Sequence, residues 1–342
     1  MRIAALVVRI LRQFVRDKRT LGLLIFAPIL VLTMLNLVFN GDKYVPKIGL
    51  VGVPEPLQEQ LNLEDAKITE YETIKLAKVD LEDKEIDAYI AFENQAPSIM
   101  LEGSDPSVNG AVVKWIQTAF KPLQQPSATD QLDIQFLHGS SDMGQFDYFG
   151  PVLLGFFIFF FVFLIGGVSF LRERTTGTLE RLLSSPLRRW EIVVGYILGF
   201  GIFTVLQSGI IVSYAIYVLG MLMEGNIGYV LLVTLLLALS ALTLGIFLSS
   251  FANNELQMMQ FIPIIVVPQV FFSGLFNLET ISEWLSWIGP ITPLYYAANA
   301  LRDVMVRGYG WTEIWLDILV LAGFSVLFLI LNIFALKKHR KI

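Results

Sequence analysis

The residue types that most often carry catalysis are scarce in this sequence and lie far apart. The chain contains no cysteine, which excludes a disulfide framework, a thiolate metal site and a cysteine nucleophile. Its two histidines, His138 and His339, fall in separate segments, so they cannot jointly bind a metal or share a catalytic triad. Ser140 and Ser141 follow His138 within Gly-Ser-Ser-Asp, a composition typical of a loop. We therefore expect neither an enzyme active site nor a metal centre.

The sequence also lacks a nucleotide-binding loop. A phosphate-cradling loop needs Gly-x-x-x-x-Gly-Lys-Ser/Thr, so that backbone N–H groups and the lysine meet the phosphates, and the chain contains no such run. Gly195, Gly199 and Gly201 lie in an apolar stretch without a nearby lysine, and we interpret them as small residues that permit close helix packing. No cofactor is expected on this chain.

One charged segment, residues 172–191, stands between two apolar stretches and reads RERTTGTLERLLSSPLRRWE. Thr178 is expected to cap a short helix that ends before Pro186. Leu179, Leu182 and Leu183 would form its apolar edge, and these polar residues would remain in water: Arg174, Glu180, Arg181, Arg188 and Arg189. Such a helix suits docking on a protein partner, or it rests on lipid head groups.

The composition indicates a membrane protein around this segment. Of the 342 residues, 55% are hydrophobic and only 16% are charged. The apolar residues are gathered into runs close to the roughly 20 residues that cross a hydrocarbon core. We expect six membrane-spanning helices, at residues 20–39, 148–171, 192–220, 228–250, 258–276 and 313–336. The central parts of these runs lack ionisable residues, which disfavours coupling to an ion gradient.

The N-terminal residues 1–19 are expected to form an amphipathic helix at the membrane interface. The basic residues on its polar face are Arg2, Arg9, Arg12, Arg16 and Arg19, and the opposite face is apolar. The order of charged, apolar and small residues that marks a cleavable signal peptide is missing, so we expect this segment to be retained.

Residues 40–147 differ in character from the rest of the chain. They carry nineteen acidic residues, eight lysines and no arginine, a net charge of −11. Strands are expected at 46–53, 67–71, 87–92 and 98–102, and helices at 73–85 and 107–123. We expect a small α/β domain outside the bilayer, between the first and second spans.

Orientation follows from the basic residues of the short loops, which mark the cytoplasmic side. Lysine and arginine concentrate in the N-terminal segment, at 172–189 and in the tail 337–342, and six spans place all three on one side. We expect both termini in the cytoplasm. Gly289, Pro290 and Pro293 interrupt residues 277–312, so this segment is expected to form short helices dipping into the outer leaflet, or else an ordinary external loop.

The charged segment carries a resemblance to a known family. The run from Glu173 to Pro186 resembles the signature of type-2 ABC exporter permeases, through these residues: Glu173, Gly177, Thr178, Glu180, Leu182, Leu183 and Pro186. The late segment with Pro290, Pro293, Tyr295 and Arg302 is also similar to that family. The resemblance implies an α-helical polytopic protein of a bacterial cell membrane.

The resemblance further implies that the signature residues, together with Arg188, form a coupling helix. This helix would bind a separate cytoplasmic ABC ATPase, which would hold ATP and Mg²⁺. The permease would pair with a second copy of itself or with a sister permease. A hydrophobic or amphipathic compound, such as a drug, an antibiotic or a lipid-like molecule, would be exported, as in multidrug resistance.

Five residues are candidates for the translocation path. Phe157 and Phe160 lie in the second expected span, and Met258, Phe261 and Gln269 lie in the fifth. Such aromatic and thioether walls suit amphipathic cargo, but the same residues also suit contact with lipid or packing between helices. The alternative function is a membrane sensor or scaffold whose external domain binds a ligand or protein. Nothing in the sequence indicates a nucleic-acid partner.

Overall fold

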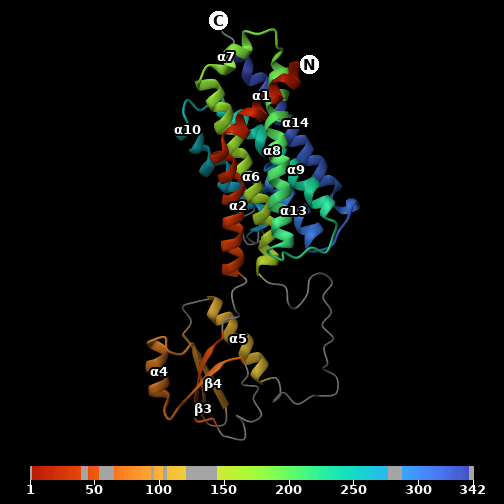
Figure 1. The fold of residues 1–342 in the computed structure, drawn as a ribbon. Coiled ribbons are helices and arrows are strands. Elements are labelled where there is room, and N and C mark those ends of the chain that lie inside the picture. Colours follow the sequence, from red (N-terminus) through yellow and green to blue (C-terminus); the bar gives the residue numbers. More distant parts are fainter. Residues whose placement is uncertain are drawn as a thin grey trace. The chain divides into compact units, whose positions relative to one another are not determined.

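A computed structural model describes residues 2–39, 45–53, 65–93, 96–102, 106–120, 145–275 and 287–338. The chain divides into two compact units (Figure 1). The helical unit comprises Met1–Gly41 and Phe136–Ile342, and the smaller unit comprises Asp42–Gln135. The inserted unit therefore lies within the acidic segment expected at 40–147. His138, Ser140, Ser141 and His339 lie outside the described residues.

The helical unit contains six helices long and apolar enough to cross a membrane, counted among the described residues. Its elements are α1 (Arg2–Arg16), α2 (Lys18–Phe39), α6 (Gln145–Thr175), α7 (Thr178–Leu183), α8 (Arg189–Tyr217), α9 (Ile227–Ser249), α10 (Glu255–Met259), η2 (Ile262–Val266), α11 (Val267–Val270), η3 (Phe271–Leu275), η5 (Gly289–Ile291), α13 (Pro293–Met305) and α14 (Trp311–Lys338). The six expected spans are confirmed. Helix α6 continues to Thr175, so the first four residues of the charged segment 172–191 form its last turn.

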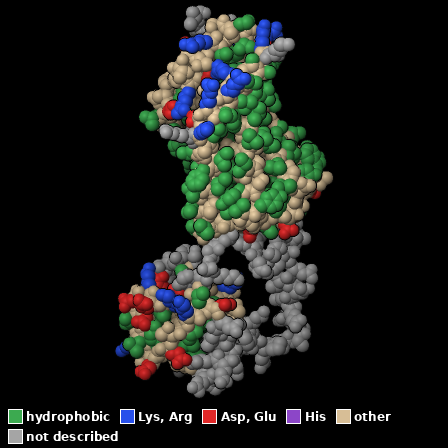
Figure 2. Space-filling model, viewed as in Figure 1, with side chains coloured by type: hydrophobic (Ala, Val, Ile, Leu, Met, Phe, Trp, Pro, Cys, Tyr) green, Lys and Arg blue, Asp and Glu red, His purple; other side chains and the backbone are tan. Residues whose placement is uncertain are grey.

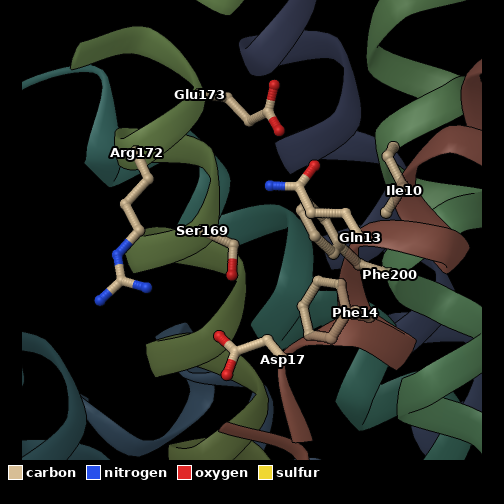
Figure 3. Close-up of a pocket in the computed structure, with 8 residues that line it drawn as sticks. All are labelled: Ile10, Gln13, Phe14, Asp17, Ser169, Arg172, Glu173 and Phe200. Atoms are coloured by element: carbon tan, nitrogen blue, oxygen red, sulfur yellow. The ribbon is translucent and has the colours of Figure 1, made fainter. Parts of the chain in front are cut away.

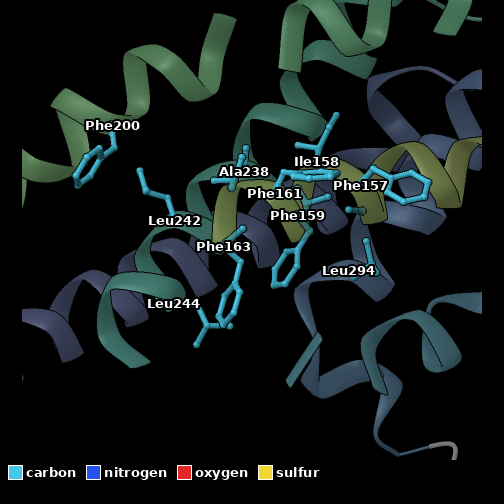
Figure 4. Close-up of a cluster of buried hydrophobic side chains, with 14 of the residues drawn as sticks. Phe157, Ile158, Phe159, Phe161, Phe163, Phe200, Ala238, Leu242, Leu244 and Leu294 are labelled. Atoms are coloured by element: carbon cyan, nitrogen blue, oxygen red, sulfur yellow. The ribbon is translucent and has the colours of Figure 1, made fainter. Parts of the chain in front are cut away.

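Helices α6 and α9 form the centre of this unit. A Cβ atom built on Gly245 of α9 would lie 2.4 Å from the Phe163 carbonyl oxygen of α6, so the two backbones are in close contact. Phenylalanines of α6 fill the space around this contact, including Phe159 and Phe163, which lie one helical turn apart and are fully buried (Figure 4). The aromatic richness of α6 thus serves helix packing in large part.

A buried hydrogen bond from a side-chain amide joins α8 to α2. Pro28 lies inside α2 and has no N–H, so the Leu24 carbonyl one turn earlier lacks its usual partner. The Gln207 side chain of α8 donates to that carbonyl at 3.1 Å, and Gln207 is 4% exposed. A neighbouring helix therefore satisfies the backbone group that the proline frees.

Replacing Gln207 by leucine is expected to destabilise the protein by about 1–2 kcal/mol, the cost of an unsatisfied buried carbonyl. In a Pro28→Ala background the same replacement should cost under about 0.5 kcal/mol, because the introduced alanine supplies the missing N–H to the Leu24 carbonyl. Denaturation in detergent of the two single variants and the double variant measures the difference. Equal costs in both backgrounds would show that the proline does not create the need for Gln207.

The end of the fifth span and α13 lie together near the start of α6. The span contains two π-helical segments, η2 and η3, and Gly274 adopts a positive φ of 80° near its end. Helix α13 packs against α6, α9 and α14, and its Leu294 and Leu301 are fully buried beside Gly155 of α6. Residues 293–305 are thus a buried helix rather than an ordinary loop, and residues 276–286 lie outside the described part.

The smaller unit is a four-stranded sheet in the order β2-β1-β3-β4. The strands are β1 (Lys47–Val51), β2 (Lys67–Tyr71), β3 (Ala88–Glu93) and β4 (Ala96–Leu101), and only β3 and β4 pair antiparallel. Helix α5 (Pro106–Phe120) packs Trp115 on the face of Leu50, and α4 (Ile74–Glu82) packs Leu81 on the opposite face. The expected strands and helices are confirmed to within a few residues. Its position outside the bilayer stays a prediction.

Candidate functional site

The short helix α7 sits on a sharp turn at the end of α6. Gly177 precedes α7 with φ +72°, a conformation that costs little only for glycine. Gly177 is the N-cap, so the expectation that Thr178 caps this helix was wrong. Thr178 is the first helical residue, and its hydroxyl lies 3.2 Å from that of Thr176. The chain reverses here before α8 begins after Arg188.

Helix α7 presents one apolar edge to the bundle, as expected. Leu179 is 1% exposed, and Leu182 and Leu183 are half-buried against the same hydrophobic core. Glu180 and Arg181 are exposed on the other side. The leucines therefore attach α7 to the membrane helices, and the surface free for a partner is charged. Pro186 and Arg188 are also exposed in the turn that follows.

Glu173 anchors the end of α6 that supports α7. Its carboxylate is 5% exposed and accepts two hydrogen bonds through Oε2, from Arg9 Nη2 at 2.5 Å and from Tyr196 Oη at 2.9 Å. Arg9 Nη2 also donates to Tyr196 Oη at 3.1 Å. Three helices, α1, α6 and α8, thus meet at one buried carboxylate.

This arrangement favours the protonated, charged form of Arg9. Burial alone would lower the pKa of its guanidinium, but the Tyr196 hydroxyl and the Glu173 carboxylate outweigh burial and raise the pKa above its usual value. Beside Glu173 lies a cavity of about 60 Å³ between α1, α6 and α8, with Gln13, Asp17 and Glu173 around it (Figure 3). Arg9, which was expected on the polar face of the N-terminal helix, is thus half-buried in a contact with α6 and α8.

The neighbouring arginines tie α6 to the start of α10 and to the loop before it. Arg172 forms an ion pair with Glu255, at 2.7 Å between Nε and Oε1. Arg174 donates to the carbonyls of Ser250, at 2.8 Å, and of Ala252. Arg174 is half-buried, so the expectation that it remains in water was also wrong. We name Arg9, Arg172, Glu173, Arg174, Tyr196 and Glu255 the polar corner.

Helix α1 packs along α8 in parallel. Leu6 lies against Gly195 and Ile10 against Gly199, and the Phe14 ring stacks on that of Phe203 at 4.6 Å. Both partners advance by four residues at each step, which defines the parallel direction.

The two glycines form a Gly-x-x-x-Gly groove for this helix, which confirms the packing role expected for Gly195 and Gly199. Space is open around Gly201, so the same interpretation was wrong there. The amphipathic helix is confirmed, but it ends at Arg16 and lies against the bundle.

The candidate path residues lie mostly inside this chain. Phe157, Met258 and Gln269 are buried. Met258 packs on Gly167, and the Gln269 side chain donates to Ile265 O at 3.0 Å and accepts from Leu294 N–H at 3.4 Å. Phe160 and Phe261 are half-buried and keep some accessible surface.

A family model described as ABC-2 family transporter protein matches residues 18–334. The chain belongs to this family. Membership confirms what the motif at 173–186 indicates, and with the six apolar helices it establishes a multi-pass membrane protein. The match is to transporter proteins rather than to a family of enzymes.

Several ABC proteins are similar to this member of the ABC-2 family. ABC transporter G family member 20 of Dictyostelium discoideum is 27% identical over 75% of this chain and 35% of its own length. The probable multidrug ABC transporter permease YbhR of Escherichia coli strain K12 is 26% identical over 48% of this chain and 46% of its own. YbhS of the same strain, also a probable multidrug ABC transporter permease, is 20% identical over 96% of this chain and 94% of its own length. The chain thus spans about a third and about half of the first two relatives.

Sequence reasoning found Glu173 and the α7 segment but missed the partners that hold them. Arg9 precedes Glu173 by 164 residues, and Tyr196 follows it by 23. An ionisable residue at the end of an apolar run was the available signal, since such a group needs a buried partner. Which partner it takes is not encoded locally.

Proposed function

We propose that this ABC-2 family protein is the permease subunit of an ATP-driven exporter. A separate cytoplasmic ABC ATPase binds at the charged face of α7 and holds ATP and Mg²⁺, and a hydrophobic or amphipathic compound leaves the cell. The relatives named as probable multidrug permeases support this substrate class. The absence of a phosphate-binding loop from the sequence supports a separate ATPase.

The polar corner is the observation that carries this proposal. A displacement of α7 acts on the end of α6, where Glu173 is bonded to α1 and α8. In the same turn Arg172 is bonded to α10 and Arg174 to the α9–α10 loop. Movement of a docked ATPase is therefore passed to most of the membrane helices through short, charge-assisted bonds.

The arrangement of the helical unit supports the orientation in this proposal. Figure 1 shows the start of α1, helix α7 and the end of α14 at one end of the helical unit, with the end of α2 and the start of α6 at the other. The basic segments therefore share one side, which the positive-inside rule makes cytoplasmic. The smaller unit is inserted in the sequence between α2 and α6, so we propose that it lies outside a bacterial cell membrane.

We further propose that the permease acts as a dimer with a second copy or a sister permease, and that cargo passes between the two. Phe160 and Phe261 are the candidate path residues that keep exposed surface for such a passage. The buried Phe157, Met258 and Gln269 would then shape its wall from behind.

The test uses the exposed charges of α7. Changing Glu180 and Arg181 together to alanine is expected to reduce co-purification of the ABC ATPase about tenfold, the effect of losing roughly 1.4 kcal/mol of binding free energy. The leucines of α7 are unsuitable, because they also hold the helix to the bundle. The matched control is Lys78→Ala with Glu82→Ala, an exposed pair of opposite charges on α4.

Transport is measured with the full chain and its ATPase in vesicles that report efflux of an amphipathic dye. ATP-dependent flux that falls in the α7 variant and persists in the α4 variant supports the permease role. A chain that binds a partner but gives no nucleotide-dependent flux is the sensor or scaffold of the alternative hypothesis. Unchanged ATPase binding in the α7 variant would overturn the docking role of this surface.

A further inference from the structure

The face of α1 that points away from α8 is both basic and accessible. Leu6, Ile10 and Phe14 occupy the docked side and are buried. On the other side a shallow groove runs along the helix, lined by Ala5, Val8, Arg9, Arg12, Gln13 and Arg16. Arg12 and Arg16 are exposed there, one helical turn apart.

These two arginines keep their charge available. Within the described residues neither Arg12 nor Arg16 takes part in a salt bridge, whereas Arg9 is engaged by Glu173. Asp17 is the single acidic residue of residues 2–39. A guanidinium presents planar, paired N–H groups that fit phosphate oxygens, and two of them on one face form a site for one phosphate group.

The position of this face on the molecule indicates that the phosphate belongs to a lipid head group. Helix α2 begins at Lys18, directly after α1, and its Leu23, Phe26 and Leu30 are exposed apolar residues of the first span. Figure 2 shows basic side chains gathered over α1, immediately beside the hydrophobic surface of the helical unit. Basic residues at the border of an apolar belt lie at the level of lipid head groups.

Exposed valines alternate with the arginines on the same helix. Val8 is 45% exposed and Val15 is 59% exposed, beside Arg12 and Arg16. Apolar side chains interleaved with cations are typical of surfaces that enter the upper acyl region while the charges bind head groups. A soluble acidic protein would not require these exposed valines.

We propose that Arg12 and Arg16 form a binding site for the head group of an anionic phospholipid. The phosphate accepts hydrogen bonds from both guanidinium groups, and the acyl chains lie beside Val15 and the outer face of α2. Because Arg9 on the same helix holds Glu173, a lipid bound here stabilises α1 in its docked position. The site itself does not depend on the transport role proposed above.

The test places a reporter in the groove. The chain has no cysteine, so Val8→Cys carries a single fluorophore, and Val326→Cys on α14, 56% exposed, gives the control position. The full chain is reconstituted in phosphatidylcholine vesicles containing nitroxide-labelled phosphatidylglycerol or nitroxide-labelled phosphatidylcholine, and quenching is recorded against mole fraction. At position 8 we expect half-maximal quenching at a several-fold lower mole fraction of phosphatidylglycerol. At position 326 the two lipids should be equivalent.

The variants then assign this preference to the arginines. Arg12→Gln with Arg16→Gln should remove most of this several-fold preference, because basic residues near an anionic surface supply the attraction to the head groups. Arg12→Lys with Arg16→Lys should keep most of it, and Lys75→Gln with Lys78→Gln on α4 should leave it unchanged. Equal quenching by both lipids at position 8, or a preference that survives the glutamine changes, would overturn the site. Loss of ATPase binding in the glutamine variant without any lipid preference would assign this face to the protein partner instead.

Discussion

Glu173→Gln is expected to reduce ATP-driven transport by at least about tenfold and to lower the stability of the protein at the same time. Glutamine preserves the size of the side chain and still accepts from Tyr196, but it removes the only carboxylate that pairs with Arg9 within the described residues. Breaking a buried ion pair costs about 3–5 kcal/mol, and we expect about 2 kcal/mol here because the Arg9 side chain is 35% exposed. Transport falls because α1 no longer follows the end of α6 once its ion pair with Glu173 is lost.

A double-mutant cycle isolates this pair from the rest of the polar corner. Arg9→Gln and Glu173→Gln, singly and together, should show a coupling energy of about 1–2 kcal/mol in detergent denaturation. The control pair is Arg172 with Glu255, whose side chains are 55% and 44% exposed, so its coupling should stay below about 1 kcal/mol. Additive effects of the Arg9 and Glu173 changes would contradict a direct connection between α1 and the end of α6, from which α7 follows. Co-purification of the ATPase should persist in Glu173→Gln, because the docking face of α7 is unchanged.

Gly199→Ala is expected to displace α1 from the bundle. The added methyl carbon would lie 2.9 Å from the Cβ, Cγ2 and Cδ1 atoms of Ile10, a β-branched residue with 1% exposure. Branching at Cβ leaves isoleucine few rotamers, so the clash is relieved by movement of the helix rather than of the side chain. Overpacking of this kind costs about 1–3 kcal/mol. Loss of the docked helix should also weaken the Arg9 bond to Glu173.

The measurement uses a single reporter cysteine at position 6, which is possible because the chain has no other cysteine. Leu6 is 4% exposed, so Leu6→Cys should react slowly with a maleimide in detergent, and Gly199→Ala should accelerate labelling about tenfold if docking is weakened by roughly 1.4 kcal/mol. Gly201→Ala is the control: it makes the same change of helix propensity, and no atom lies within 4 Å of the added Cβ. Equal labelling in the two alanine variants would refute the groove as the docking site.

Much of the fold follows from local properties of the chain. Each span depends on the hydropathy of about 20 consecutive residues, and the strands and helices of the smaller unit depend on periods of 2 and 3.6. The same reasoning located α7, because Thr178 and Pro186 are residues that a helix can begin with and stop before. Cap geometry was missed, since Thr178 and Gly177 are both acceptable before a helix and the backbone angle decides between them.

The partners across the structure could not be predicted in this way. The carbonyl freed by Pro28 is visible in the sequence, but Gln207 as its donor is not. Gly195 and Gly199 indicate a close helix contact, yet the sequence does not show that α1 fills the groove in parallel. Met258 and Gln269 suit a cargo path by residue type, and only their burial places them within the packing of the bundle.

The residue types alone led us to expect no catalytic set and no nucleotide site, and they also located the charged segment between two spans. Those properties belong to residue types and to neighbours within one or two helical turns. The tertiary structure decided that Glu173 is held by Arg9 and Tyr196, and that Arg172 holds α10 while Arg174 holds the loop before it. These contacts join residues up to 164 positions apart, and they depend on how whole helices pack, which no local pattern specifies.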